Sequence, residues 1–248
     1  MDCIESHWNR RSASYDDFVV KGFSDLRERR SWQEHFSSIL GDGPLNVLDV
    51  GCGPGIVSMQ LADLGHHVTS VDLSEDMLEC ARRNAERNGL DIDFRKGNAM
   101  SLDFPDGSFD AVVSDYMLWT VPDPRRVVSE WHRVLRPGGV LAHTDGDWFN
   151  DPKMTRLRTG VSNIFLRIDG TGSGDDDPEF VRQKLWSNGA ERPGDDVRML
   201  EDAGFTDIRV INDVQRRVLH GVRYLAHGIT NTHFTVTARK RAVTSSRR

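Results

Sequence analysis

Short apolar runs alternate along the chain with segments in which apolar residues recur every three to four positions. The runs that predict β-strands are 45–50, 67–72, 92–96, 109–114 and 140–145. The segments between them predict helices at 56–64, 74–87 and from Asp123 to the Pro-Gly-Gly at 137–139, and 25–40 predicts a further helix before the first strand. This alternation is typical of a parallel sheet that is covered by helices on both faces.

The pattern changes after residue 145. Helical spacing at 154–168 is followed by a Gly/Asp-rich loop at 169–177 and a helix at 195–203. Two further strands, at 205–211 and 234–238, would complete the sheet. The predicted fold class is α/β: a Rossmann-like, doubly wound, mostly parallel seven-stranded sheet with helices on both faces and a small cap insertion. The expected divisions are an N-terminal helical lid (1–44), the core (45–150), a substrate cap (151–194), a segment that completes the sheet (195–241) and a disordered tail (242–248).

Composition narrows the class of protein. The 248 residues carry 32 Lys and Arg against 38 Asp and Glu, and a net charge of −6 argues against nucleic acid as the main partner. Three cysteines without a CxxC spacing predict neither a disulfide framework nor a zinc ribbon. No apolar run reaches the roughly 18 residues of a membrane helix, and the polar start of the chain lacks the apolar stretch of a signal peptide. We therefore expect a cytoplasmic protein without a metal cofactor or a membrane partner.

The strongest chemical signal is the sequence LDVGCGPG at 48–55, a buried strand that runs into a glycine-rich turn and then a helix. Glycines permit close approach of a ligand to the backbone, and free amides at a helix start favour anionic groups. Asp72 ends the second strand about 20 residues further on, where a carboxylate can accept both hydroxyls of a ribose. The alternative for Asp72 is a cap at the strand end. Ile56 breaks the dinucleotide fingerprint, and no GKS or GKT phosphate loop is present.

These motifs resemble those of the class I S-adenosylmethionine (SAM)-dependent methyltransferases, in particular the small-molecule branch with the ubiquinone- and menaquinone-pathway enzymes. LDVGCGPG and VDLSEDML (71–78) are similar to the first two motifs of this family. FPDGSFDAVVS (104–114), the VPDP helix start (121–124) and LRPGGVL (135–141) follow in the family's order. The resemblance covers about 46–145 well and the flanks weakly.

The resemblance implies a role for individual residues in binding SAM. Asp49, Gly51 and Gly53 would hold the methionine end, Asp72 the ribose, and Leu73 and Met77 the adenine. Asn98 stands where the family has aspartate in Gly-Asp-Ala, and its amide oxygen can still accept from the adenine amino group. Tyr15 would close the site as part of the lid, with an aromatic packed on the sheet edge as the alternative. The full predicted cofactor set is Tyr15, Asp49, Gly51, Cys52, Gly53, Asp72, Leu73, Met77, Asn98, Ala99 and Ser114.

The exits of strands four and five offer candidate residues for catalysis and acceptor binding. The predicted catalytic set is Asp115, Tyr116, His143 and Asp145, and the predicted substrate-binding set is Trp119, Asp147 and Trp148. Asp145 has the alternative role of satisfying loop amides. No cysteine lies at either exit, which argues against pyrimidine C5 methylation. His220, His227 and His233 lie in a long connection between the last two strands. Each is interpreted as an ordinary surface or packed histidine, with a base or a ligand as the alternative.

The predicted function is methyl transfer from SAM to nitrogen or oxygen of a small-molecule metabolite, with S-adenosylhomocysteine as the second product. The acidic residues and aromatic walls favour an amine-bearing acceptor. An RNA or protein methyltransferase and a non-catalytic SAM-binding module are the alternatives. The segment 152–193 is interpreted as a substrate cap, with a surface helix or a homodimer contact as the alternative.

Overall fold

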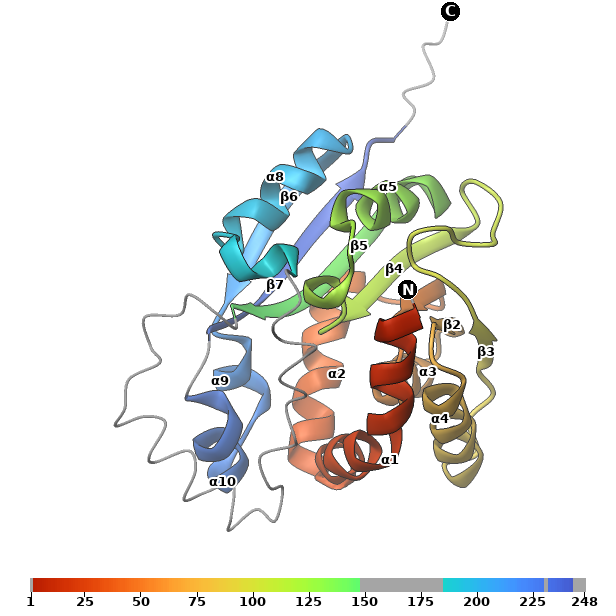
Figure 1. Ribbon diagram of the computed structural model, residues 1–248, viewed down its shortest axis with the longest axis vertical. Helices are drawn as coiled ribbons and strands as arrows, with labels where there is room; N and C mark the ends of the chain where they lie inside the picture. The colour runs from red at the N-terminus through yellow and green to blue at the C-terminus, as the bar shows by residue number, and fades with distance from the viewer. Residues whose placement is uncertain (1, 148–184, 230–231, 243–248) are drawn as a thin grey trace, which may run out of the picture.

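The computed structural model describes residues 2–147, 185–229 and 232–242, and its centre is one seven-stranded sheet (Figure 1). The strand order is β3-β2-β1-β4-β5-β7-β6. The first five strands run parallel, and β7 runs antiparallel to both of its neighbours. The strands are β1 (Asn46–Val50), β2 (His67–Asp72), β3 (Asp93–Lys96), β4 (Phe109–Asp115), β5 (Leu135–Asp147), β6 (Phe205–Asn212) and β7 (Thr232–Lys240). The predicted fold class is thus confirmed.

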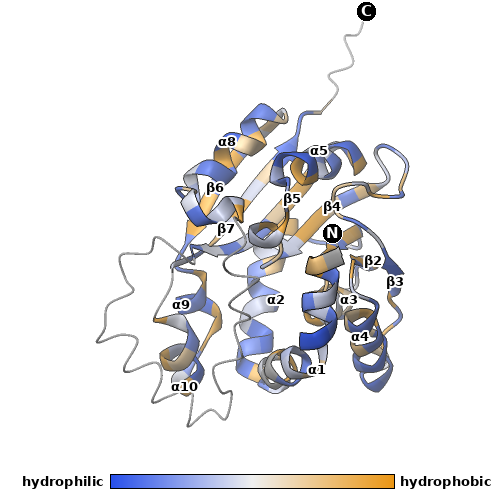
Figure 2. Ribbon diagram, in the orientation of Figure 1, coloured by the Kyte–Doolittle hydropathy of each residue, from blue (hydrophilic) through white to orange (hydrophobic). Residues whose placement is uncertain are grey.

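Helices cover both faces of this sheet, as the alternation of side chains along buried strands requires. Val47 packs with α2 (Leu26–Leu40) and α3 (Ile56–Asp63) on one face. Leu48 packs with α5 (Pro124–Val134) and α8 (Gly194–Asp202) on the other. Figure 2 shows the central strands β4 and β5 coloured mainly as hydrophobic, the edge strand β3 as hydrophilic, and both colours along the helices. Within the described ranges, no helix is long and apolar enough to cross a membrane.

Local signals in the sequence account for most helix boundaries. Ser74 caps α4 (Glu75–Arg87) by accepting from the Met77 amide, and Asp123 caps α5 by accepting from the Arg126 amide. The predicted end of α5 needs a correction. The helix stops at Val134, before Pro137, because a residue that precedes proline is pushed into extended backbone. β5 consequently begins at Leu135.

The order of the strands fixes where a ligand can bind. The chain moves outward from β1 to β3 and then returns to the other side of β1 with β4. At such a reversal the connections leave in opposite directions and open a crevice at the carboxyl ends of the strands. The other described elements are the long helix α1 (Asp2–Ser24) and the short segments η1 (Leu118–Thr120), η2 (Trp186–Gly189), α9 (Val214–Val218), α10 (Gly221–Arg223) and the π-helix η3 (Tyr224–Gly228).

The structure describes only part of the predicted cap. The helix expected at 154–168, the loop at 169–177 and the residues up to 184 lie outside the described residues, and so do 243–248 of the expected tail. The described end of the cap region contacts η1. The Trp186 indole N–H donates to the Leu118 carbonyl at 2.8 Å, and the Ser187 hydroxyl donates to the Trp119 carbonyl at 2.9 Å.

Candidate functional site

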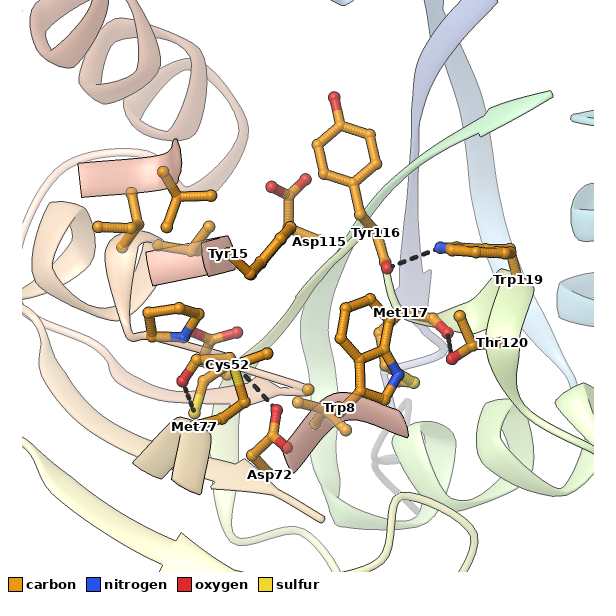
Figure 3. A pocket seen from close by; sticks show the side chains of 18 of the residues that line it. Trp8, Tyr15, Cys52, Asp72, Met77, Asp115, Tyr116, Met117, Trp119 and Thr120 are labelled. Atoms are coloured by element: carbon orange, nitrogen blue, oxygen red, sulfur yellow. Dashed lines mark hydrogen bonds between the residues drawn. The ribbon is translucent and has the colours of Figure 1, made fainter. Parts of the chain in front are cut away.

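A cavity of about 780 Å³ occupies the crevice at the carboxyl ends of β1, β2 and β4 (Figure 3). Its lining contains most of the residues that the sequence predicted for the site. These are Tyr15, Asp49, Gly51, Cys52, Gly53, Asp72, Leu73, Met77, Asn98, Ala99, Asp115, Tyr116 and Trp119. Ser114, His143, Asp145 and Asp147 are not in the lining, and Trp148 lies outside the described residues.

The glycine turn after β1 forms the floor of the cavity and is held by Asp72. One carboxylate oxygen of Asp72 accepts from the Gly53 amide at 2.8 Å, and the other accepts from the Ser74 amide at 2.8 Å. Gly51 has φ +75°, and a Cβ there would lie 2.3 Å from the Met117 side chain. The turn therefore requires glycine at 51. Asp72 does cap the turn, and its ligand role stays a prediction.

Buried carboxyl groups give the cavity an acidic character, and burial disfavours their charged form. Asp49 is 1% exposed, and burial raises its pKa to about 7 even though the Ser58 hydroxyl donates to it at 2.6 Å. Burial also raises the pKa of Asp115 well above its usual range, and the charges of Asp49 and Asp145 add to this. Asp49 Oδ1 and Asp115 Oδ1 are both buried without a hydrogen-bond partner in the described structure. A cationic ligand would stabilise these carboxylates in the charged form.

One face of α1 lines the cavity. The residues of this face, spaced by three or four positions, are Ile4, Trp8, Arg11, Tyr15 and Val19. Three polar contacts join the helix to the β2–β3 side: Asn9 with Ser74 at 2.5 Å, Asp16 with Asn84 at 2.6 Å, and Glu5 with Lys96 at 2.7 Å. Tyr15 thus borders the cavity, while its function as part of a lid stays a prediction.

The side of the cavity over β4, β5 and β7 has a different character. It is walled mainly by apolar and aromatic side chains: Trp32 and Phe36 of α2, Trp119 and Val121 after β4, and Leu219 after α9. The polar residues among them are Gln215, His227, His233 and the paired Glu28 and Arg223. Sequence reasoning missed Gln215, and it gave His227 and His233 a base or ligand role only as the alternative. No motif marks the connection between β6 and β7, and only the pairing of β7 with β5 brings His233 opposite Gly146.

The structure corrects the placement of His143 and Asp145. Both are 0% exposed and belong to a buried ion cluster with Arg192 and Asp196, away from the cavity lining. Asp145 also accepts from the amides of Trp119 at 3.1 Å and Gly146 at 2.8 Å. Asp145 therefore has the alternative role of satisfying loop amides, and we do not retain either residue as a catalytic candidate.

Two other predicted residues, Ser114 and Asp147, are also outside the cavity lining. The Ser114 hydroxyl donates to the Val50 carbonyl at 2.9 Å and so joins β4 to β1 in the core. Asp147 is 9% exposed at the end of β5. Within the described ranges, no group of three or more His, Cys, Asp or Glu side chains could hold a metal ion.

Comparison with known proteins agrees with this arrangement. A family profile described as "Methyltransferase domain" matches residues 48–143. A demethylmenaquinone methyltransferase of Listeria welshimeri is 37% identical over 175 residues, which are 67% of this chain and 72% of that protein. A ubiquinone biosynthesis O-methyltransferase of Xanthomonas axonopodis pv. citri is 38% identical over 109 residues, 44% of this chain and 46% of that one. The solved structure of a SAM-dependent methyltransferase from Methanosarcina mazei has a TM-score of 0.56 at 27% identity and covers 81% of this chain and 94% of its own.

The fold and the site thus define an enzyme that methylates with SAM. The chain belongs to the class I SAM-dependent methyltransferases, in the branch of the quinone-type enzymes, as the motifs of the sequence predicted.

Proposed function

We propose that the cavity binds SAM over β1, β2 and β3 and a hydroxylated aromatic small molecule over β4, β5 and β7, and that the methyl group is transferred to a hydroxyl oxygen. The observation that carries this proposal is the contrast between the two sides of one cavity. The first side has a glycine turn and buried carboxylates, and the second has apolar and aromatic walls with few polar groups. Such walls bury a planar ring, and the few polar groups orient it.

The residues of the first side fit SAM. When bound, SAM supplies a methyl group on a positively charged sulfur, together with an ammonium group, and the carboxylates of Asp49 and Asp115 offer buried acceptors for such charges. Gly51 and Gly53 let the backbone approach the methionine end. Asp72 would accept the ribose hydroxyls with its remaining lone pairs. Asn98 uses its side-chain oxygen to accept from the Met100 amide at 2.9 Å, and it would border the adenine with Leu73, Met77 and Ala99.

An aromatic acceptor is also consistent with the names of the relatives, which refer to menaquinone and ubiquinone compounds. In-line transfer to such a ring depends mainly on positioning and on the exclusion of water. Trp119 and Tyr116 stand at the exit of β4, between the two sides, and would orient the ring. Asp115 beside them would face the positive charge of the donor.

The acceptor is tested with SAM and two probes, 1,4-dihydroxynaphthalene and 1-naphthylamine. We expect the first to gain one methyl group, with NMR placing it on oxygen. A methyl group on a ring carbon would contradict the oxygen assignment but keep the aromatic acceptor. Methylation of the amine alone would favour the amine-bearing acceptor that the acidic residues also fit. Transfer to RNA or protein, with no transfer to any small molecule, would overturn the proposal.

The cofactor half of the proposal predicts the effect of changing Asp72. We expect Asp72→Ala to weaken binding of S-adenosylhomocysteine at least ~30-fold, because it removes the ribose acceptor and releases the Gly53 amide that shapes the turn. Isothermal calorimetry measures the change. Asp76→Ala is the matched control, since Asp76 is an exposed aspartate in α4, the helix that follows Asp72, and does not line the cavity. Equal affinities for wild type and Asp72→Ala would show that SAM binds elsewhere.

A further inference from the structure

Tyr116 has a backbone conformation that a bulky residue rarely adopts. It follows the last residue of β4 with φ +52°, in the left-handed region. Such strain costs on the order of 1–3 kcal/mol and persists only where the surroundings impose it. The Tyr116 amide still donates to the Thr144 carbonyl of β5 at 2.8 Å, which fixes the backbone at the sheet edge. The side chain thereby lines the cavity beside Asp115 and Trp119 (Figure 3).

The hydroxyl of Tyr116 is held by two side chains that come from distant parts of the chain. Gln215 of α9 donates from Nε2 to this oxygen at 2.8 Å. His233 of β7 lies with Nδ1 at 3.1 Å from it, and the two rings meet edge to face at 5.4 Å between centroids. Gln215 and His233 are each 5% exposed, and both line the cavity with Tyr116. Three elements therefore converge on one oxygen at the acceptor side.

The donors and acceptors in this group define the direction in which a proton can be transferred, from the Tyr116 hydroxyl to His233. A phenol oxygen has one proton and two lone pairs, and the Gln215 amino group can only donate, so it occupies one lone pair. The Tyr116 proton can then go to Nδ1 of His233, and the second lone pair can accept from a bound molecule. Burial raises the pKa of Tyr116, and the charges of Asp115 and Asp145 raise it further. Tyr116 therefore remains a neutral phenol and can take a proton only by passing its own proton on.

We propose that Tyr116 and His233 form a proton relay for a hydroxylated acceptor, with Gln215 as the positioning residue. As the acceptor oxygen forms its bond to the methyl carbon, its proton moves to the Tyr116 oxygen and the Tyr116 proton moves to His233 Nδ1. The carbon–sulfur bond breaks with its electron pair on sulfur. The positive charge of the donor thus ends as an imidazolium, whose proton returns through the Tyr116 hydroxyl to water in the cavity once the methylated product has left. The relay rests on the proposed function, since it needs an acceptor that loses a proton.

The relay predicts that the cost of removing His233 depends on the acidity of the acceptor. With catechol, we expect His233→Asn to lower kcat about 100-fold with KM within ~3-fold, the usual scale of general-base catalysis. With 4-nitrocatechol at pH 8, which is largely ionised before it binds, we expect a loss below ~5-fold. His220→Asn is the control, because His220 contacts Ser31 and does not line the cavity. Equal losses of kcat on the two probes would mean that His233 only shapes the site and would overturn the relay.

A second readout does not depend on turnover. 4-Nitrocatechol changes its absorption spectrum on ionisation, so its protonation state can be measured in the complex with S-adenosylhomocysteine at pH 6. We expect wild type to bind more of the ionised form than His233→Asn or Tyr116→Phe does. Identical spectra in the three complexes would overturn the relay even if the enzyme methylates catechols. If wild type neither binds nor methylates either catechol, the proposed aromatic acceptor fails first and the relay with it.

Discussion

Replacing Asp49 by asparagine should remove the contribution of this residue to the pH dependence of the free energy of unfolding. The same change should weaken SAM binding at least tenfold. Asp49 is buried at the end of β1 and accepts from Ser58, which in turn accepts from Ser70 at 2.9 Å. Its Oδ1 has no hydrogen-bond partner in the described structure. In the ligand-free protein its negative charge is therefore poorly compensated, and a bound cation would compensate it.

The sign of the pH effect follows from its pKa of about 7, which burial raises first and the charge of Asp72 raises further. Between the unfolded pKa near 4 and about 7, the folded carboxyl holds a proton that the unfolded chain has released. The folded state binds more protons in this range, so the free energy of unfolding falls as pH rises, by at most ~1.4 kcal/mol per pH unit. From pH 5 to pH 7 we expect wild type to lose about 2 kcal/mol relative to Asp49→Asn.

Urea unfolding of ligand-free wild type and Asp49→Asn at several pH values measures this difference, and calorimetry with SAM measures the loss of binding. Asp93→Asn is the control, since Asp93 is half exposed and paired with Arg95 at the surface, and it should leave both quantities unchanged. Parallel pH curves for wild type and Asp49→Asn would show that burial does not disfavour the charge of Asp49.

The sequence could predict the parts of this enzyme that local patterns determine. The alternation of apolar runs and helical spacing predicted the sheet, because buried parallel strands appear in a sequence as short apolar runs and amphipathic helices as apolar residues every three to four positions. Ser74 and Asp123 marked helix starts because a cap acts over three residues. The glycine turn and Asp72 were found for the same reason, since both stand at fixed offsets from a strand end.

The residues that sequence reasoning misplaced are those whose environment depends on contacts between distant segments. His143 and Asp145 were expected at the exit of the fifth strand. They are two positions apart, so both side chains project to the same side of β5. On that side His143 contacts Trp131 of α5 and Asp196 of α8, and this places the pair in the core. Arg192, which compensates Asp145, carries no local signal for this contact.

Replacing Arg192 by methionine should destabilise the protein by about 3–5 kcal/mol, the cost of leaving buried carboxylates without their cation. The Arg192 side chain is 1% exposed. It donates to Asp145 at 3.0 Å and twice to Asp196, at 2.5 and 2.9 Å. Burial works to raise the pKa of Asp196, but the bonds from Arg192 outweigh it and hold this pKa at about 2. In this cluster the stability that Asp196 contributes is present above about pH 4 and lost as pH falls towards 2.

A matched pair of variants separates the buried charge from a general effect of losing arginine. Arg125 pairs with Asp202 at 2.6 Å, but both side chains are more than 60% exposed, and Arg125→Met should cost less than ~0.5 kcal/mol. Adding Asp196→Leu to Arg192→Met should recover part of the loss, because it removes one of the two uncompensated carboxylates. Urea unfolding measures all three. An Arg192→Met variant as stable as Arg125→Met would show that the cluster contributes nothing to folding. In Arg192→Met, Asp145 also loses the partner that holds it against the Trp119 amide. Because Trp119 lines the cavity, we expect this variant to bind the acceptor more weakly while it binds S-adenosylhomocysteine as before.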